Sequence, residues 1–88
     1  MIKFMIIENY RESCFDKIYE RLHKKGRMLP EGLYFIESWL EKNGQRCFQL
    51  METSNPDLFR TWIKNWEDLV EFEIIEIGEK PKSEKTNT

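Results

Sequence analysis

The sequence has little of what metal, redox or nucleophilic sites are built from. Histidine occurs once, as His23 in a lysine-rich segment, and the two cysteines, Cys14 and Cys47, lack metal-ligand spacing. One histidine cannot form a multi-histidine metal site, and nothing indicates a histidine-based catalytic triad. We therefore expect no metal and no cofactor, and the isolated cysteines predict free thiols in a reducing compartment.

The sequence also lacks an excess of one charge and a long hydrophobic run. It carries 14 basic and 16 acidic residues, a net charge of -2, which is too small to recruit nucleic acid or anionic lipid. The longest apolar run, residues 4–7, is far shorter than the ~20 residues of a membrane span. No signal peptide is evident. We expect a cytoplasmic protein that binds neither nucleic acid nor membrane.

The length of the chain predicts one small domain. At 88 residues it is shorter than the roughly 100–200 residues of a typical domain. We expect that domain to span residues 1–78 and to be followed by a disordered tail over 79–88, which has no large apolar side chain. Because so short a chain buries only about 60–65% of its unfolded surface, its stability should be marginal unless something else covers apolar area.

Hydrophobic periodicity predicts six elements in the order strand, helix, strand, strand, helix, strand. An apolar stripe at helical spacing follows Ser13, which we expect to act as the N-cap. Asn43 and Gly44 predict a type I′ turn between the second and third strands. Asn55 and Pro56 mark the start of the second helix. The predicted strands are 2–7, 33–42, 45–52 and 70–77.

The predicted turn sets a register that sorts the hairpin side chains by face. A two-residue turn pairs Trp39 with Phe48 and Glu37 with Leu50. One face then carries Phe35, Glu37, Trp39, Phe48, Leu50 and Glu52, and the other carries Tyr34, Ile36, Ser38, Leu40, Cys47, Gln49 and Met51. Because the side chains of the second set are smaller, we assign that face to the helices.

This order of elements predicts an α+β fold, a ferredoxin-like βαββαβ sandwich with an antiparallel sheet in the order 4-1-3-2 and both helices on one face. Apolar residues nevertheless occupy both faces of the sheet. The uncovered face, about 400 Å² before side chains are counted, would be a large apolar patch for a monomer. We therefore expect a homodimer that pairs two sheets through their open faces.

Several sequence blocks also carry a family resemblance. These are RMLPEGL, RCFQLMET, the pair Trp62 and Trp66, and DLVEFE. They resemble a family of short stand-alone proteins catalogued as a domain of unknown function, over roughly residues 1–77. That family looks like a member of the dimeric α+β barrel superfamily, so the resemblance implies ferredoxin-like subunits paired into a barrel. Relatives in the superfamily include cofactor-independent monooxygenases, isomerases and ligand-binding domains, and the family itself supplies no activity.

The weak catalytic candidates are Glu37 and Glu52, a diagonal pair on one face of the hairpin. Such neighbours lie roughly 7–8 Å apart, and the surrounding apolar side chains would raise the pKa of at least one carboxyl toward that of a general acid or base. The alternative is that both lie near sheet edges or pair with basic side chains, and we favour that alternative.

Three further residues are candidates for ligand binding. Arg27, in a loop stiffened by a proline, either holds an anionic substrate or forms a surface ion pair. Gln49, opposite Ser38, either orients a substrate carbonyl in a cleft between sheet and helices or makes an ordinary internal hydrogen bond. Trp39 either stacks on a flat ligand or packs in the core or the dimer.

Two functions from different classes follow. The first is a small dimeric protein that binds a small organic ligand without turnover, and we favour it slightly because no residue set demands catalysis. The second is a cofactor-independent enzyme, similar to a monooxygenase or an isomerase, acting on a flat or enolisable molecule. A closed cavity that contains a carboxylate with a raised pKa would favour the enzyme.

Overall fold

The structure, a computed structural model, describes residues 1–12 and 14–79. The predicted cap Ser13 and residues 80–88 of the predicted tail lie outside the described residues. The order of elements is βαββαβ, as the sequence predicts. The elements are β1 (Ile2–Tyr10), α1 (Phe15–Lys25), β2 (Leu33–Leu40), β3 (Arg46–Thr53), α2 (Leu58–Ile63) and β4 (Val70–Ile77).

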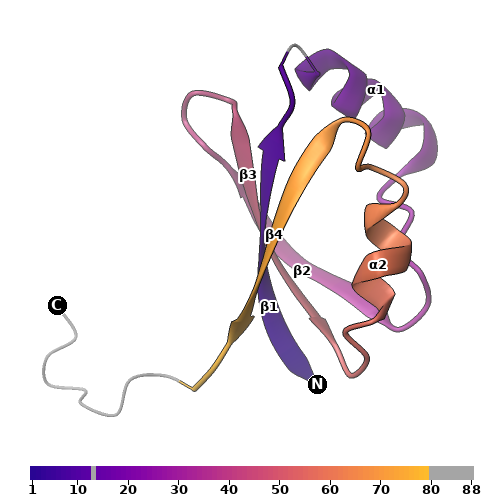
Figure 1. The fold of residues 1–88 in the computed structure, drawn as a ribbon, viewed down its shortest axis with the longest axis vertical. Coiled ribbons are helices and arrows are strands. Elements are labelled where there is room, and N and C mark those ends of the chain that lie inside the picture. The colour runs from indigo at the N-terminus through magenta and orange to yellow at the C-terminus, as the bar shows by residue number, and fades with distance from the viewer. Residues whose placement is uncertain (13, 80–88) are drawn as a thin grey trace, which may run out of the picture.

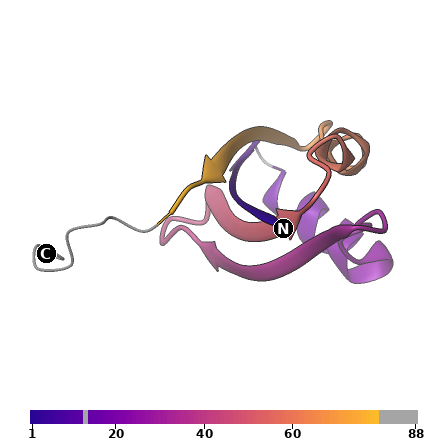
Figure 2. The ribbon, with the colours of Figure 1, turned by 90° about the horizontal axis from the view of Figure 1, so that it is seen from below.

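The four strands form one antiparallel sheet in the order β2-β3-β1-β4 (Figure 1). Counted from β4, the same neighbours read 4-1-3-2, so the apolar strands β1 and β3 are the central ones. The sheet is strongly curved, and both helices lie on its concave side (Figure 2). The protein is therefore a two-layer α+β structure in which one face of the sheet is covered by helices and the other is left open.

The hairpin register near the turn agrees with the prediction, and farther from the turn it does not. Trp39 pairs with Phe48, and Glu37 pairs with Leu50. Between Phe35 and Glu37 the register then shifts, so that Phe35 pairs with Met51. A bulge inserts one residue in one strand, which reverses the facing of every residue beyond it. The prediction that Phe35 shares a face with Glu37 is therefore wrong.

Strand β1 continues three residues beyond its predicted end. The predicted strand, 2–7, stops before residues 8–12, which carry few apolar side chains. In the structure Glu8 pairs with Cys47 on β3 and with Phe72 on β4, and Asn9 pairs with Arg46 and Glu71. A central strand has its backbone groups satisfied on both edges, so two neighbouring strands can hold a polar segment in the sheet. This extension brings Glu8 into the interior.

The two helices differ in length and in how they end. Helix α1 ends at Gly26, whose φ of 67° suits a glycine. Helix α2 begins only at Leu58, after the side chain of Asn55 has accepted a hydrogen bond from the Asp57 amide at 3.1 Å. After Ile63 the chain tightens into turns, which are typical of helix ends. In the described residues, neither helix is long and apolar enough to cross a bilayer.

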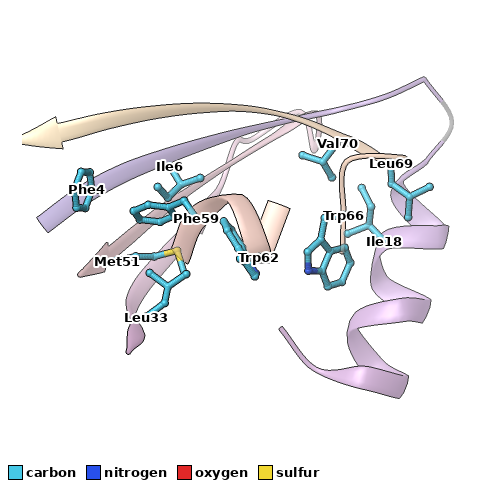
Figure 3. Packing of buried hydrophobic residues seen from close by; sticks show 10 residues of the cluster. All are labelled: Phe4, Ile6, Ile18, Leu33, Met51, Phe59, Trp62, Trp66, Leu69 and Val70. Carbon is cyan, nitrogen blue, oxygen red and sulfur yellow. The ribbon is translucent and has the colours of Figure 1, made fainter. Parts of the chain in front are cut away.

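The hydrophobic core lies between the sheet and the two helices (Figure 3). Trp62, 1% exposed, packs edge-on against Phe59 and Phe72 at ring-centroid distances of 6.4 and 5.3 Å. Ile6 and Met51 beneath it are fully buried. The assignment of the Gln49 face to the helices is thus confirmed. The buried apolar side chains are Phe4, Ile6, Ile18, Leu33, Met51, Phe59, Trp62, Trp66, Leu69 and Val70.

The opposite side of the sheet, which we call the open face, carries apolar side chains in contact with solvent. By strand alternation from the buried residues, Tyr34, Trp39, Ile75 and Ile77 lie on this face. They are 47%, 49%, 41% and 40% exposed. The helices therefore shield one side of the sheet and leave the other with an apolar surface.

Candidate functional site

A cleft of about 230 Å³ opens between the sheet and the helices. Its floor is formed by strands, its walls by α1, α2 and the turns after α2, and the loop after α1 contributes one cationic side chain. It is smaller than the hollow of about 630 Å³ beside the hairpin turn, but it contains the buried polar groups. The lining residues are Glu8, Tyr10, Ile18, Tyr19, Leu22, Arg27, Ser38, Cys47, Gln49, Trp62, Trp66 and Val70.

Glu8 is the most unusual group in this cleft. It follows Phe4 and Ile6 at strand spacing on the buried face of β1, and it is 8% exposed. Its Oε2 accepts a hydrogen bond from Nε2 of Gln49 at 2.5 Å. Burial raises the pKa of Glu8 to about 7, and the hydrogen bond from Gln49 and the charge of Arg27 oppose that shift. Near neutral pH, Glu8 is therefore able both to hold and to release a proton.

Gln49 extends from the neighbouring central strand β3. It is 6% exposed, and it lies opposite Ser38 on β2, as the sequence predicts. Its amide nitrogen donates to Glu8, whereas its Oε1 is buried and has no hydrogen-bond partner among the described residues. Such unpaired buried acceptors are uncommon in folded proteins. The cleft thus contains an acceptor that the fold itself leaves unsatisfied.

Hydrogen bonds to its backbone carbonyl fix the position of Arg27 beside the cleft. Its carbonyl oxygen accepts hydrogen bonds from Nε1 of Trp62 at 3.0 Å and from Nε1 of Trp66 at 3.1 Å. Met28, the next residue, has a φ of 58°, which is costly for a side chain other than glycine. The guanidinium carbon lies 3.6 Å from the centroid of the Phe35 ring. Two indoles and one aromatic face therefore position a single cation.

Tyr10 and Cys47 add two groups that stay protonated at neutral pH. Burial raises the pKa of the Tyr10 phenol and of the Cys47 thiol, and the charge of Glu8 contributes to both shifts. Both cysteines are free, and both are partly buried. A thiol with a raised pKa is a weak nucleophile, so these two side chains supply hydrogen bonds and polarity rather than covalent chemistry.

The structure brings two of the five predicted site residues together. Arg27 and Gln49 both line the cleft. Trp39, the third predicted ligand-binding residue, lies on the open face and is 49% exposed. Glu37 and Glu52 also lie on the open face, where Glu37 is exposed and Glu52 is half-buried. None of these three lines the cleft, so a ligand held there does not meet them.

Sequence reasoning missed Glu8. A signal was available in the alternation of the strand. Phe4, Ile6 and Tyr10 point to the same face, and Glu8 occupies the position of that face between Ile6 and Tyr10. That signal was overridden by the run of polar residues that follows. In the residues that the structure describes, no three histidine, cysteine or carboxylate side chains come close enough to hold a metal ion.

The comparisons with known proteins give a family but no activity. No curated protein matches the sequence. The model of a domain of unknown function, DUF3303, matches residues 2–78, a segment that includes all six elements and every residue that lines the cleft. Because this match spans nearly the whole described chain, the protein belongs to the DUF3303 family.

Proposed function

We propose that this protein binds a small organic ligand in the cleft between the sheet and the helices. The observation that carries the proposal is the pair Glu8 and Gln49, two polar side chains more than nine-tenths buried at the floor of a cavity. Cores normally exclude such groups unless every polar atom is satisfied, and Oε1 of Gln49 has no partner in the part of the chain that the structure describes. Binding sites commonly consist of apolar walls with a few converging polar groups, as here.

The size of the cleft limits the ligand. Its volume of about 230 Å³ exceeds the roughly 150 Å³ of an engineered cavity that holds benzene, and it is below the ~300 Å³ at which drug-sized pockets begin. The walls are largely aromatic and aliphatic, with Trp62, Trp66, Ile18 and Leu22 among them. A compact ligand with about one ring and a few polar substituents fits these limits.

This proposal is tested with the indole N–H signals of the ¹⁵N-labelled protein. Benzoate, phenol, indole and toluene are titrated separately to millimolar concentration. Binding in the cleft shifts the Nε1–H signals of Trp62 and Trp66, which line it, and leaves that of Trp39 on the open face unchanged. Signals are assigned with single Trp→Phe variants. If none of the four compounds moves the two cleft indoles, or if Trp39 moves equally, the cleft is not a ligand site.

A second function, proton transfer without a cofactor, is favoured by one observation. Glu8 lies in the cleft with a pKa of about 7, and a carboxylate tuned in this way suits a general base near neutral pH. It would take a proton from a carbon next to a carbonyl and return it to another atom of the same molecule. Isomerase-like chemistry therefore fits the cleft better than monooxygenase-like chemistry, because it needs only Glu8 and the substrate.

Hydrogen exchange distinguishes turnover from simple binding. An enolisable 2-oxo acid, phenylpyruvate, is incubated with the protein in D₂O, and loss of its C3 proton signal is followed by NMR. A proton-transfer enzyme accelerates the exchange, and Glu8→Gln abolishes the acceleration. The double variant Glu37→Gln, Glu52→Gln serves as the matched control, since both carboxylates lie on the open face. Binding of phenylpyruvate without faster exchange favours the binding protein.

We also propose that a second copy of the chain covers the open face. Four large apolar side chains there are at least 40% exposed, and a patch of this kind on a small domain usually marks an interface. A twofold pairing of two such faces would bury about 800 Å² per subunit if it reached the standard size. Sedimentation equilibrium at micromolar concentration tests this, and a single subunit mass contradicts it. The free thiols support the expectation that the protein works in the cytoplasm.

A further inference from the structure

We infer that the ligand of the cleft is a small apolar carboxylic acid that also carries a hydroxyl group, with the hydroxyl donated to Oε1 of Gln49 and the carboxylate held by Arg27. This inference rests on the proposed ligand binding in the cleft and adds the chemical class of the ligand. It combines the unpartnered acceptor, the positioned cation and the apolar walls between them.

The acceptor calls for a donor. Gln49 is 6% exposed, and its Nε2 already donates to Glu8. While Glu8 is ionised, the same contact orients the amide, because the opposite orientation would set its oxygen against the carboxylate. Oε1 therefore faces away from Glu8, buried and without a partner among the described residues. A ligand that donates to Oε1 removes the cost of that unmade hydrogen bond, and a ligand that lacks a donor does not.

The cation calls for an anion. Among the described residues, no carboxylate oxygen lies within 4.0 Å of the Arg27 guanidinium, although three other arginines, Arg11, Arg21 and Arg46, form ion pairs. Arg27 instead lies over the Phe35 ring at 3.6 Å. The N–H groups along the edge of a guanidinium match the two oxygens of a carboxylate. Its backbone is fixed by two indoles, so little freedom is lost on binding.

The ligand group that donates to Oε1 of Gln49 is better a hydroxyl than an ammonium group. Burial disfavours the charged form of Glu8, and the neutral form offers no charge to compensate a buried cation. Arg27 already supplies one positive charge to the same cleft, and a second would be repelled. A hydroxyl group is neutral, so it can donate to Gln49 without adding a second positive charge to the cleft.

Matched probes test the class of ligand. The 2-, 3- and 4-hydroxybenzoates are compared with benzoate, which lacks the donor, with phenol, which lacks the anion, and with the three aminobenzoates, which replace the hydroxyl by an N–H donor. Dissociation constants come from the Trp62 and Trp66 indole signals. At least one hydroxybenzoate should bind about tenfold tighter than both benzoate and phenol. Each of these two probes lacks one polar contact, and the free energy of one hydrogen bond corresponds to about a tenfold change in the dissociation constant.

Two variants assign the contacts. Gln49→Met keeps the shape of the side chain and removes the acceptor, so it should reduce the affinity of the best hydroxybenzoate to that of benzoate. Arg27→Met should reduce it to that of phenol. Trp39→Phe, on the open face, is the control and should change none of the constants. The spread of amide signals verifies folding, and the wild-type probe comparison alone decides the question if Gln49→Met does not fold.

Each other outcome overturns a separate claim. Equal binding of hydroxybenzoate, benzoate and phenol contradicts the ligand class and leaves ligand binding in the cleft intact. Tighter binding of an aminobenzoate than of any hydroxybenzoate contradicts the hydroxyl assignment. If no probe shifts the cleft indoles, and neither indole nor toluene does so, the proposed function fails together with this inference.

Discussion

The two faces of one sheet differ in what they do with polar and apolar side chains. Along β3, Gln49, Met51 and Thr53 face the helices and are buried, whereas Leu50 and Glu52 between them face outward and are half-buried. On the covered face, polar groups are desolvated and held by specific partners. On the open face, apolar side chains meet solvent. The same backbone thus presents a polar cleft on one side and an apolar surface on the other, because helices cover only one side.

The largest effect should come from the covered face. Trp62→Ala removes a ring that is 1% exposed, its packing against Phe59 and Phe72, and its hydrogen bond to Arg27. We expect a loss of about 3–5 kcal/mol in the free energy of unfolding, measured by urea denaturation. Because small domains have little stability to spare, the variant should be largely unfolded.

The matched control is Trp39→Ala, which removes the same side chain from the open face, where it is 49% exposed. At protein concentrations low enough to keep subunits apart, it should cost less than about 1 kcal/mol. Similar losses for the two variants would mean that the faces do not differ as described.

Glu8→Gln should change how stability depends on pH. The pKa of Glu8 rises from its ordinary 4.5 to about 7 in the folded protein, so between these values the folded state binds more protons than the unfolded chain. The free energy of unfolding therefore falls by about 3 kcal/mol in total as pH rises from 4.5 to 7, and it levels off above pH 7.

The glutamine variant stays neutral and should lose that dependence, becoming more stable than the wild type above pH 7. Urea denaturation at a series of pH values measures the difference. Glu37→Gln, which removes a carboxylate from the open face, is the control and should keep the wild-type dependence. Parallel curves for the wild type and Glu8→Gln would refute the burial of an ionisable Glu8.

Ile75→Glu should separate the proposed dimer without unfolding the subunit. Ile75 is 41% exposed on the open face, so a charge there is tolerated in a single chain and is unpaired in a twofold interface. We expect the dimer dissociation constant to rise about a hundredfold, or about 2.7 kcal/mol, by sedimentation equilibrium.

Ile74→Glu provides a neighbouring control. Ile74 is 38% exposed but pairs with Ile6, on the side of the sheet that faces the helices. It should leave the dissociation constant unchanged. If both variants weaken the dimer equally, the interface is not the open face.

The smallest effect is expected for Glu37→Gln and Glu52→Gln. Neither carboxylate takes part in a hydrogen bond or an ion pair with the other described residues. In the Ile75→Glu background, each change should alter the free energy of unfolding by no more than about 0.5 kcal/mol. It should also leave binding of the best hydroxybenzoate unaltered. A clear loss of binding would mean that Glu37 or Glu52 contributes to the ligand site after all.

The sequence predicted the fold more fully than the site. Asn43 and Gly44 are a local signal for a tight turn, and the register beside it was therefore correct, including Ser38 opposite Gln49. The predicted type I′ geometry was wrong, because Gly44 has a positive φ and Asn43 does not. The bulge before Glu37 has no comparable local signal, so Phe35 was assigned to the wrong face. Of the site, Arg27 and Gln49 were anticipated. Glu8 was not, because its burial depends on two strands that lie far away in the sequence.

The sequence by itself determined the order of elements, the central position of its most apolar strands and the assignment of helices to one face. These follow from periodicity and turn chemistry, which act over a few residues. Only the tertiary structure decided which carboxylate is buried, where the indoles of Trp62 and Trp66 hold the Arg27 backbone, and that one amide oxygen has no partner among the described residues. Desolvation and hydrogen-bond satisfaction depend on everything that surrounds a group, and those surroundings come from all parts of the chain.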